Sequence, residues 1–192
     1  MTTTKTKIEK PIPKLQPNPF QFEILGLASK QRTNAKKIEV LQEYRNDALI
    51  TLMIMNYDDS VISILPEGAV PYATADEQSS MSGTLTNLID SKAKNDGMKS
   101  TGYYGTEDFA NQTAKTSIRN EYQNFYIYVR GGTDGLTQIR KETMFINMLQ
   151  GLHELEAELM CLVKDKKLTS KYNISFDVVK EAYPDIVWGG RS

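Results

Sequence analysis

Cysteine, histidine and tryptophan each occur once in this chain of 192 residues, as Cys161, His153 and Trp188. One cysteine forms neither an internal disulfide nor a thiolate cage around a metal, and this usage suits a reducing compartment. Long hydrophobic runs are also missing, since no apolar stretch approaches the roughly 20 residues of a membrane span. The N-terminal MTTTKTKIEK lacks the apolar stretch of a signal peptide. We therefore expect neither export nor a membrane partner.

The chain also lacks an excess of charge of one sign, since its formal net charge is −1. Residues 1–40 are nevertheless basic and residues 41–110 acidic, so a globally basic nucleic-acid binder is excluded while a local basic arm is not. Hydrophobic residues make up 40% of the chain and charged residues 24%, a composition that forms a core. At this length one domain is expected.

Two segments differ from the rest in composition. Residues 1–19 carry four prolines among lysines and threonines, which predicts an extended arm without helical hydrogen bonds. Residues from about 73 to 115 are rich in Ser, Thr, Gly, Asn and Asp. A segment of that length is improbable as a simple connection, so it is either disordered or active on contact. We expect residues 20–192 to form one helical domain interrupted by this polar insertion.

Helices are predicted where apolar residues recur at intervals of three and four and where capping residues precede them. For residues 118–130 the spacing is helical, but aromatic and β-branched residues leave a minor strand at 124–130 as the alternative. The fold class is therefore mainly α, a compact domain of short helices. In the N-terminal half we expect a helix in FQFEILGLASK from Phe20 and a second helix capped by Thr33 or Asn34, with Ala35, Ile38, Leu41 and Tyr44 on its inward side and Lys36, Lys37, Glu39 and Glu43 largely in water. A central helix in ALITLMIM (48–55) and one or two turns in SVISILPEG (60–68), stopped by Pro66 and Gly68, follow. In the C-terminal half we expect a helix at 138–150 capped by Thr137 and closed by Gly151, a helical segment with Leu155, Leu159, Leu162 and Val163 on one side, and a last helix from Ser175 that Pro184 ends.

The single histidine lies in HELEAE, which superficially resembles the metalloprotease HExxH pattern. A second histidine would have to follow His153 four residues later on the same helical face, and Ala157 is there instead. We expect His153 to begin a helix among acidic residues that suit the helix dipole. Cys161 is expected in the core, because its neighbours are apolar, and it lies about 12 Å along the axis from His153 at 1.5 Å per residue. A direct catalytic Cys–His pair is therefore excluded.

Other patterns typical of active sites are incomplete. RGGTDGLTQ places three glycines before a helix start, where amide groups bind anions, but its spacing matches neither the P-loop nor the dinucleotide fingerprint. Asp58 and Asp59 have no partner that would separate their pKa values. We expect no catalytic residue, no metal and no cofactor, and hence no enzyme.

Two sets of residues are candidates for binding. Tyr103 and Tyr104, flanked by glycines in the insertion, and Trp188, exposed or docked in the C-terminal tail, belong to residue types enriched at protein interfaces. Lys30, Arg32, Lys36 and Lys37 form a basic cluster that would contact phosphates together with the arm. The competing interpretation of such a cluster is an ordinary solvated helix face.

Four stretches together resemble a small uncharacterised family encoded by T-even-like tailed phages, notably cyanophages and other marine myoviruses. The similarity covers roughly residues 20–72 and 118–190 and implies a viral origin, while it carries no site residue onto this chain. The stretches are FEILGLASKQRTNAKKIEVLQEY, ALITLMIMNYDDSVISILPEGAVPY, MFINMLQGLHELEAELMCLVKDKKL and VVKEAYPDIVWGG.

The leading hypothesis is a phage-encoded accessory protein, not an enzyme, that binds a host or viral protein in the cytoplasm of the infected cell. The second hypothesis is a virion or assembly component, in which the arm lies along a neighbouring subunit and becomes ordered there. The third is a nucleic-acid-associated regulator that uses the arm and the cluster at residues 30–37, with binding that weakens steeply with salt.

Overall fold

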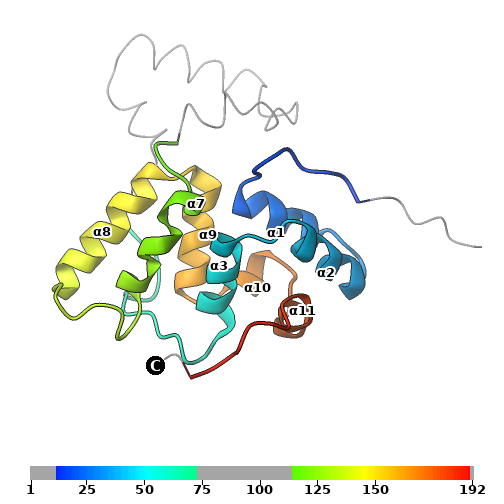
Figure 1. Cartoon of the computed structure of the whole chain (residues 1–192). Coiled ribbons are helices and arrows are strands. Elements are labelled where there is room, and N and C mark those ends of the chain that lie inside the picture. Colours follow the sequence, from blue (N-terminus) through cyan, green and yellow to red (C-terminus); the bar gives the residue numbers. More distant parts are fainter. Residues whose placement is uncertain (1–11, 73–113, 191–192) are drawn as a thin grey trace, which may run out of the picture.

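The computed structural model describes residues 12–72 and 114–190 and is mainly helical (Figure 1), which confirms the predicted fold class. The described residues contain no strand longer than an isolated bridge. Most of the predicted insertion and the first eleven residues of the arm lie outside these ranges. In chain order the described elements are α1 (Gln21–Ser29), α2 (Asn34–Glu43), α3 (Asp47–Tyr57), α7 (Ile118–Glu121), the 3₁₀ helix η2 (Tyr122–Tyr128), α8 (Gln138–Gly151), α9 (Glu154–Lys164), α10 (Leu168–Lys171) and α11 (Phe176–Ala182).

Buried side chains from both described ranges of the chain form one hydrophobic cluster. α9 lies at its centre, in contact with α1, α3, α8 and α10, and α2 packs against α1 and α11 (Figure 1). Leu49, Leu52 and Leu159 are fully buried there. None of the helices in the described ranges has the length and apolar character needed to cross a bilayer.

The described part of the arm, residues 12–19, contains no helix or strand, bends at residues 17–18 and packs against the domain. Ile12 and Leu15 pack against the core, and the Leu15 amide donates to the Tyr44 hydroxyl at 2.9 Å. This stretch therefore contributes to the domain that it precedes.

The second helix begins as predicted and buries most of its predicted face, since Leu41 is buried and Ile38 and Tyr44 pack partly buried against the core. The Thr33 side chain accepts from the Lys36 amide, which is the expected N-cap. Lys37, Val40 and Leu41 are the buried residues of α2, whereas Ala35 is exposed. Lys37 is turned inward because its ammonium donates to the carbonyl oxygen of Asn173, so its predicted place in water is wrong.

The apolar run at 48–55 forms the central helix that its composition predicts. Asn46 caps α3 by accepting from the Leu49 amide at 2.9 Å. Side chains on several sides of α3 are buried, so the run is surrounded by protein and needs no single apolar stripe.

The prediction of helical turns at 60–68 is wrong, because residues 61–64 are extended and the chain then bends at residues 65 and 67–68. Ser63 forms an isolated antiparallel bridge with Val129, and the Ile64 amide donates to the carbonyl oxygen of Tyr128 at 3.0 Å. β-branched residues and Pro66 favour that conformation. The alternative strand at 124–130 is not formed, because Tyr122–Tyr128 is a 3₁₀ helix and only Val129 takes part in the bridge.

The chain after η2 turns back so closely that residue 132 has no room for a side chain. A Cβ atom on Gly132 would lie 1.7 Å from the carbonyl oxygen of Tyr126. This turn orients the end of η2, where Tyr128 is 3% exposed and packs edge-on against Phe145 of α8 with ring centroids 5.1 Å apart.

The two longest helices of the C-terminal half begin at their predicted caps. Thr137 accepts from the Arg140 amide at the start of α8, and His153 accepts through Nδ1 from the Leu155 amide at 3.2 Å at the start of α9. The helix-start role predicted for His153 is confirmed.

The C-terminal segment closes the domain. α10 was not predicted, and it begins where the Asn56 side chain accepts from the Leu168 amide at 3.1 Å. After α11, Tyr183 is fully buried and donates its hydroxyl to the carbonyl oxygen of Leu41 at 2.9 Å. Arg45 and Asp185 form an ion pair at the surface nearby.

Candidate functional site

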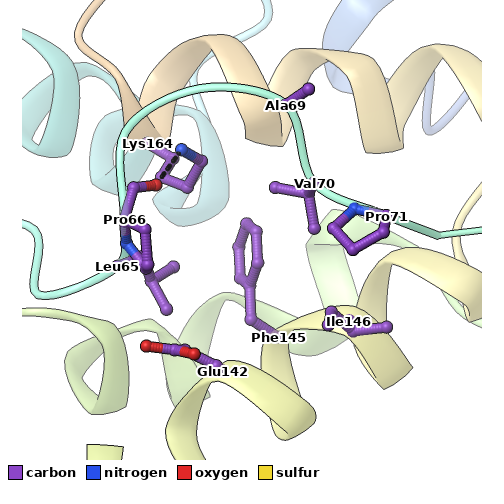
Figure 2. Close-up of a pocket in the computed structure, with 9 residues that line it drawn as sticks. All are labelled: Leu65, Pro66, Ala69, Val70, Pro71, Glu142, Phe145, Ile146 and Lys164. Carbon is purple, nitrogen blue, oxygen red and sulfur yellow. Dashed lines mark hydrogen bonds between the residues drawn. The ribbon is translucent and has the colours of Figure 1, made fainter. Parts of the chain in front are cut away.

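A surface hollow on the described residues lies between α8 and the irregular segment 65–71. Figure 2 shows Phe145 standing between the segment and the helix, with Glu142 at the Leu65 end and Ile146 near Pro71 at the other. Its volume is about 140 Å³. We name it the α8 groove and define it by its lining residues, Leu65, Pro66, Ala69, Val70, Pro71, Glu142, Phe145, Ile146 and Lys164.

The volume limits what the α8 groove accepts. Pockets for cofactors and drug-sized molecules measure roughly 300–1,000 Å³, whereas a cavity of about 150 Å³ lined by aliphatic side chains holds a benzene molecule. The groove therefore has room for one ring or one branched aliphatic side chain. Its lining is apolar except at Glu142 and Lys164.

A buried lysine holds the segment that walls the groove. The Lys164 side chain is 2% exposed, and its ammonium donates to the carbonyl oxygens of Pro66 at 2.6 Å and Gly68 at 3.2 Å. It also pairs with the carboxylate of Asp165. Burying an ammonium is unfavourable unless its protons are bound, and these contacts bind them while they hold the backbone at residues 66–68.

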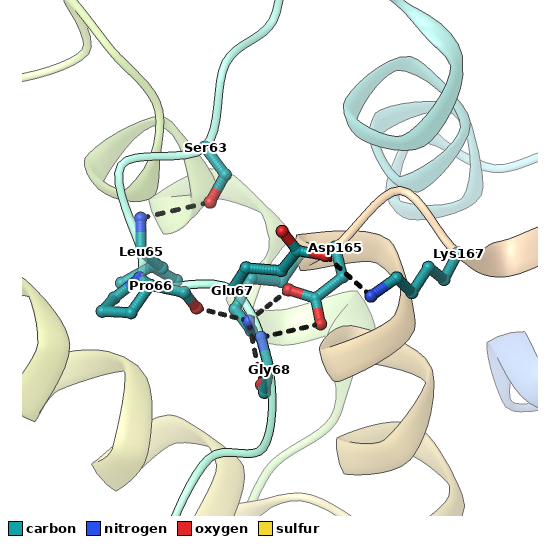
Figure 3. Close-up of polar contacts among 8 residues, drawn as sticks. Ser63, Leu65, Pro66, Glu67, Gly68, Asp165 and Lys167 are labelled. Atoms are coloured by element: carbon teal, nitrogen blue, oxygen red, sulfur yellow. Dashed lines mark hydrogen bonds and ion pairs between the residues drawn. The ribbon is translucent and has the colours of Figure 1, made fainter.

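Further contacts on the same segment are drawn in Figure 3. The Asp165 carboxylate accepts from the Gly68 amide at 3.2 Å, Lys167 pairs with Glu67 at 2.8 Å, and the Leu65 amide donates to the Ser63 hydroxyl. Gly68 has a φ of +102°, which only glycine adopts without strain. The wall is thus held in place on both sides of Pro66.

Replacing Lys164 with methionine is expected to loosen this wall. The side chain keeps its length, but two carbonyl oxygens and the Asp165 carboxylate lose their donor, so the free energy of unfolding should fall by about 2 kcal/mol. Hydrogen exchange at residues 67–70 should also accelerate. Lys167→Met is the matched control, because Lys167 is 52% exposed and surface ion pairs contribute at most about 1 kcal/mol. Equal exchange rates in the two variants would contradict the assigned role.

A buried carboxylate joins three helix starts at the N-terminal end of α9. Glu156 is 0% exposed and accepts from the Ile118 amide of α7 at 2.9 Å and from the Gln21 amide of α1 at 3.4 Å. Burial raises its pKa to about 7, although the two amides and Arg119 oppose that shift. Because both oxygens face backbone donors, the arrangement is that of a shared cap.

The rings near this carboxylate also have structural contacts. His153 stacks on Phe22 with centroids 5.2 Å apart and lies 5.5 Å from Phe20.

Cys161 is half-buried, and burial raises its thiol pKa. In the described ranges no group of three or more His, Cys, Asp or Glu residues is placed to hold a metal ion.

The predicted binding aromatics are only partly placed by the structure. Tyr103 and Tyr104 lie outside the described residues. Trp188 is docked, the second of its two expected placements, since it meets Phe176 edge-on with centroids 5.0 Å apart. Its indole Nε1 is buried and has no hydrogen-bond acceptor among the described residues. Partner binding by these three aromatics stays a prediction.

The basic cluster is smaller than predicted. Lys30 and Arg32 are exposed and Lys36 is half-buried, but Lys37 is 6% exposed and bound to Asn173. Lys37 therefore cannot reach a phosphate without leaving the core. Nucleic-acid binding by the other three stays a prediction.

The α8 groove was not predicted from the sequence. Leu65, Val70 and Pro71 belong to LPEGAVP, a stretch in which prolines and a glycine interrupt apolar residues. That pattern is typical of an extended segment, and Phe145 and Ile146 lie more than seventy residues away on α8.

Comparison with known proteins gives a family and no activity. The model of a family of unknown function, DUF6433, matches residues 24–95 and 98–170. No curated protein and no solved structure matches the chain.

Proposed function

The chain belongs to DUF6433, a family of unknown function, and on that premise we propose that it acts by binding another protein through the α8 groove. The observation that supports this proposal is the combination of size and chemistry in the groove. About 140 Å³ of mostly apolar space suits one anchoring side chain of a partner, and such anchors provide much of the binding energy of an interface.

The rigidity of the wall supports the same proposal. A partner that inserts a side chain into a preformed groove loses less entropy than one that must order a loop. The contacts of Lys164 and Asp165 with residues 66–68 provide this order before binding.

We also propose that the protein is a phage-encoded accessory protein, not an enzyme, whose partner is a host or viral protein in the infected cell. Support for the viral source comes from the sequence resemblance alone. The virion and nucleic-acid hypotheses stay predictions. The nucleic-acid hypothesis is the weaker of the two, because Lys37 is buried and does not belong to the exposed basic cluster.

Val70→Asp is the variant that tests the proposal. Its carboxylate would be covered when an apolar side chain enters the groove, so affinity should fall at least about tenfold, the equivalent of about 1.4 kcal/mol. We would compare affinity capture from infected cells with the tagged wild type and with this variant. The partner should be recovered by the wild type and depleted with Val70→Asp.

Val187→Asp is the matched control, because Val187 is 76% exposed in the tail and is not part of the groove lining. It should recover the same proteins as the wild type, and thermal unfolding should show all three proteins folded. Capture of no protein, or equal capture by all three, would contradict the proposed function.

A further inference from the structure

The two charged residues of the α8 groove differ in what they offer a ligand. The ammonium of Lys164 is already bound to two carbonyl oxygens and to Asp165. The half-buried carboxylate of Glu142 accepts from the Gln138 side chain at 2.7 Å, and no cation among the described residues forms an ion pair with it. The groove therefore presents a negative charge to a ligand.

The neighbouring cations in the sequence do not neutralise Glu142. Lys141 donates its ammonium to the carbonyl oxygen of Thr133 at 2.6 Å. Arg140 lies two positions before Glu142, and residues two apart on a helix do not face each other. Gln138 also donates to the carbonyl oxygen of Ile64 at 2.7 Å, which holds Glu142 close to the wall at Leu65.

Apolar side chains lie on both sides of this carboxylate along α8. Ile139 precedes Glu142 by three residues and Ile146 follows it by four, so all three lie on one face of the helix. Ile139 is 77% exposed, which extends the apolar surface beyond the groove. The face alternates apolar, acidic and apolar groups.

We propose that the occupant of the α8 groove is a segment of a partner protein in which an apolar side chain, one ring or one branched aliphatic group in size, lies next to a lysine or arginine that pairs with Glu142. This inference rests on the proposed function and adds the chemistry of the partner. The apolar side chain enters between Val70 and Phe145, and the cation lies at the Leu65 end. Charge complementarity of this kind selects partners.

Two small probes separate the ring from the charge. We would add 2-phenylethylammonium or 3-phenylpropionate to the full chain and follow the methyl resonances of Leu65, Val70 and Ile146 by NMR. Both probes should shift these methyl groups. The cationic probe should bind about two- to fivefold more tightly, the range of an exposed ion pair, and added salt should reduce its advantage.

Glu142→Gln should remove the preference for the cation while the ring still binds. Glu39→Gln is the control, because Glu39 is an exposed carboxylate on α2, away from the groove, and should keep the preference. Equal binding of the two probes to the wild type, or an unchanged preference in Glu142→Gln, would overturn the inference and leave the proposed function standing. Failure of both probes to shift the groove methyl groups would count against both.

Discussion

Gly132→Ala is expected to lower the free energy of unfolding by about 3 kcal/mol, at the upper end of what single substitutions cost. The added methyl group would lie 1.7 Å from the carbonyl oxygen of Tyr126 and 3.2 Å from that of Val129. Both neighbours are backbone atoms, so no side chain can rotate away, and the turn after η2 must open. Urea denaturation measures the loss.

The consequence should extend to the α8 groove. Tyr128 at the end of η2 packs edge-on against Phe145, which lies between α8 and the groove wall (Figure 2). Opening the turn shifts this contact, so Gly132→Ala should also change the NMR signals of Phe145 and Ile146 in the fraction that stays folded.

Gly135→Ala is the matched control from the same loop. A Cβ atom there meets nothing within 4 Å, and a glycine replaced without strain changes stability by less than about 1 kcal/mol, usually favourably. If the two alanine variants have equal stability, the close approach at Gly132 is not a constraint on the fold.

Helices whose signals are local were predictable from the sequence. Thr33 and Thr137 cap α2 and α8 from positions directly before their apolar spacing begins, and Asn46 does the same for α3. A cap and a periodic face lie within a few residues of each other, so neither depends on how distant segments meet.

Buried charges were not predictable, because their partners come from distant parts of the chain. Lys37 binds Asn173 across 136 positions, Lys164 binds Pro66 across 98, and Glu156 binds Gln21 across 135. In the sequence each has the spacing of a solvated helix face. The backbone groups that make their burial favourable are brought near only by folding.

The α8 groove was missed for the same reason. Its floor comes from α8, while its wall follows residues 61–64, which are extended and form a bridge where helical turns ending at Pro66 were predicted. Short apolar runs do not distinguish the two conformations. Here the bridge from Ser63 to Val129 decides between them, and that pairing is tertiary.

Glu156→Ala should destabilise the fold by about 3 kcal/mol near pH 5. Two buried amides, those of Gln21 and Ile118, lose their acceptor, and each unsatisfied amide costs about 1–3 kcal/mol. Glu154→Ala is the matched control in the same first turn of α9, since Glu154 is exposed and its dipole contribution is at most about 1 kcal/mol.

The pH dependence gives this prediction a definite sign. Burial raises the pKa of Glu156 from an ordinary 4.5 to about 7, so between these values the folded state holds a proton that the unfolded state has released. The stability that this proton provides is complete below pH 4.5 and is lost as the pH rises through about 7. The difference in unfolding free energy between the wild type and Glu156→Ala should therefore narrow from about pH 5 to about pH 8. A difference that widens over this interval would show that Glu156 is held as a carboxylate by its two amides and that burial is the weaker effect.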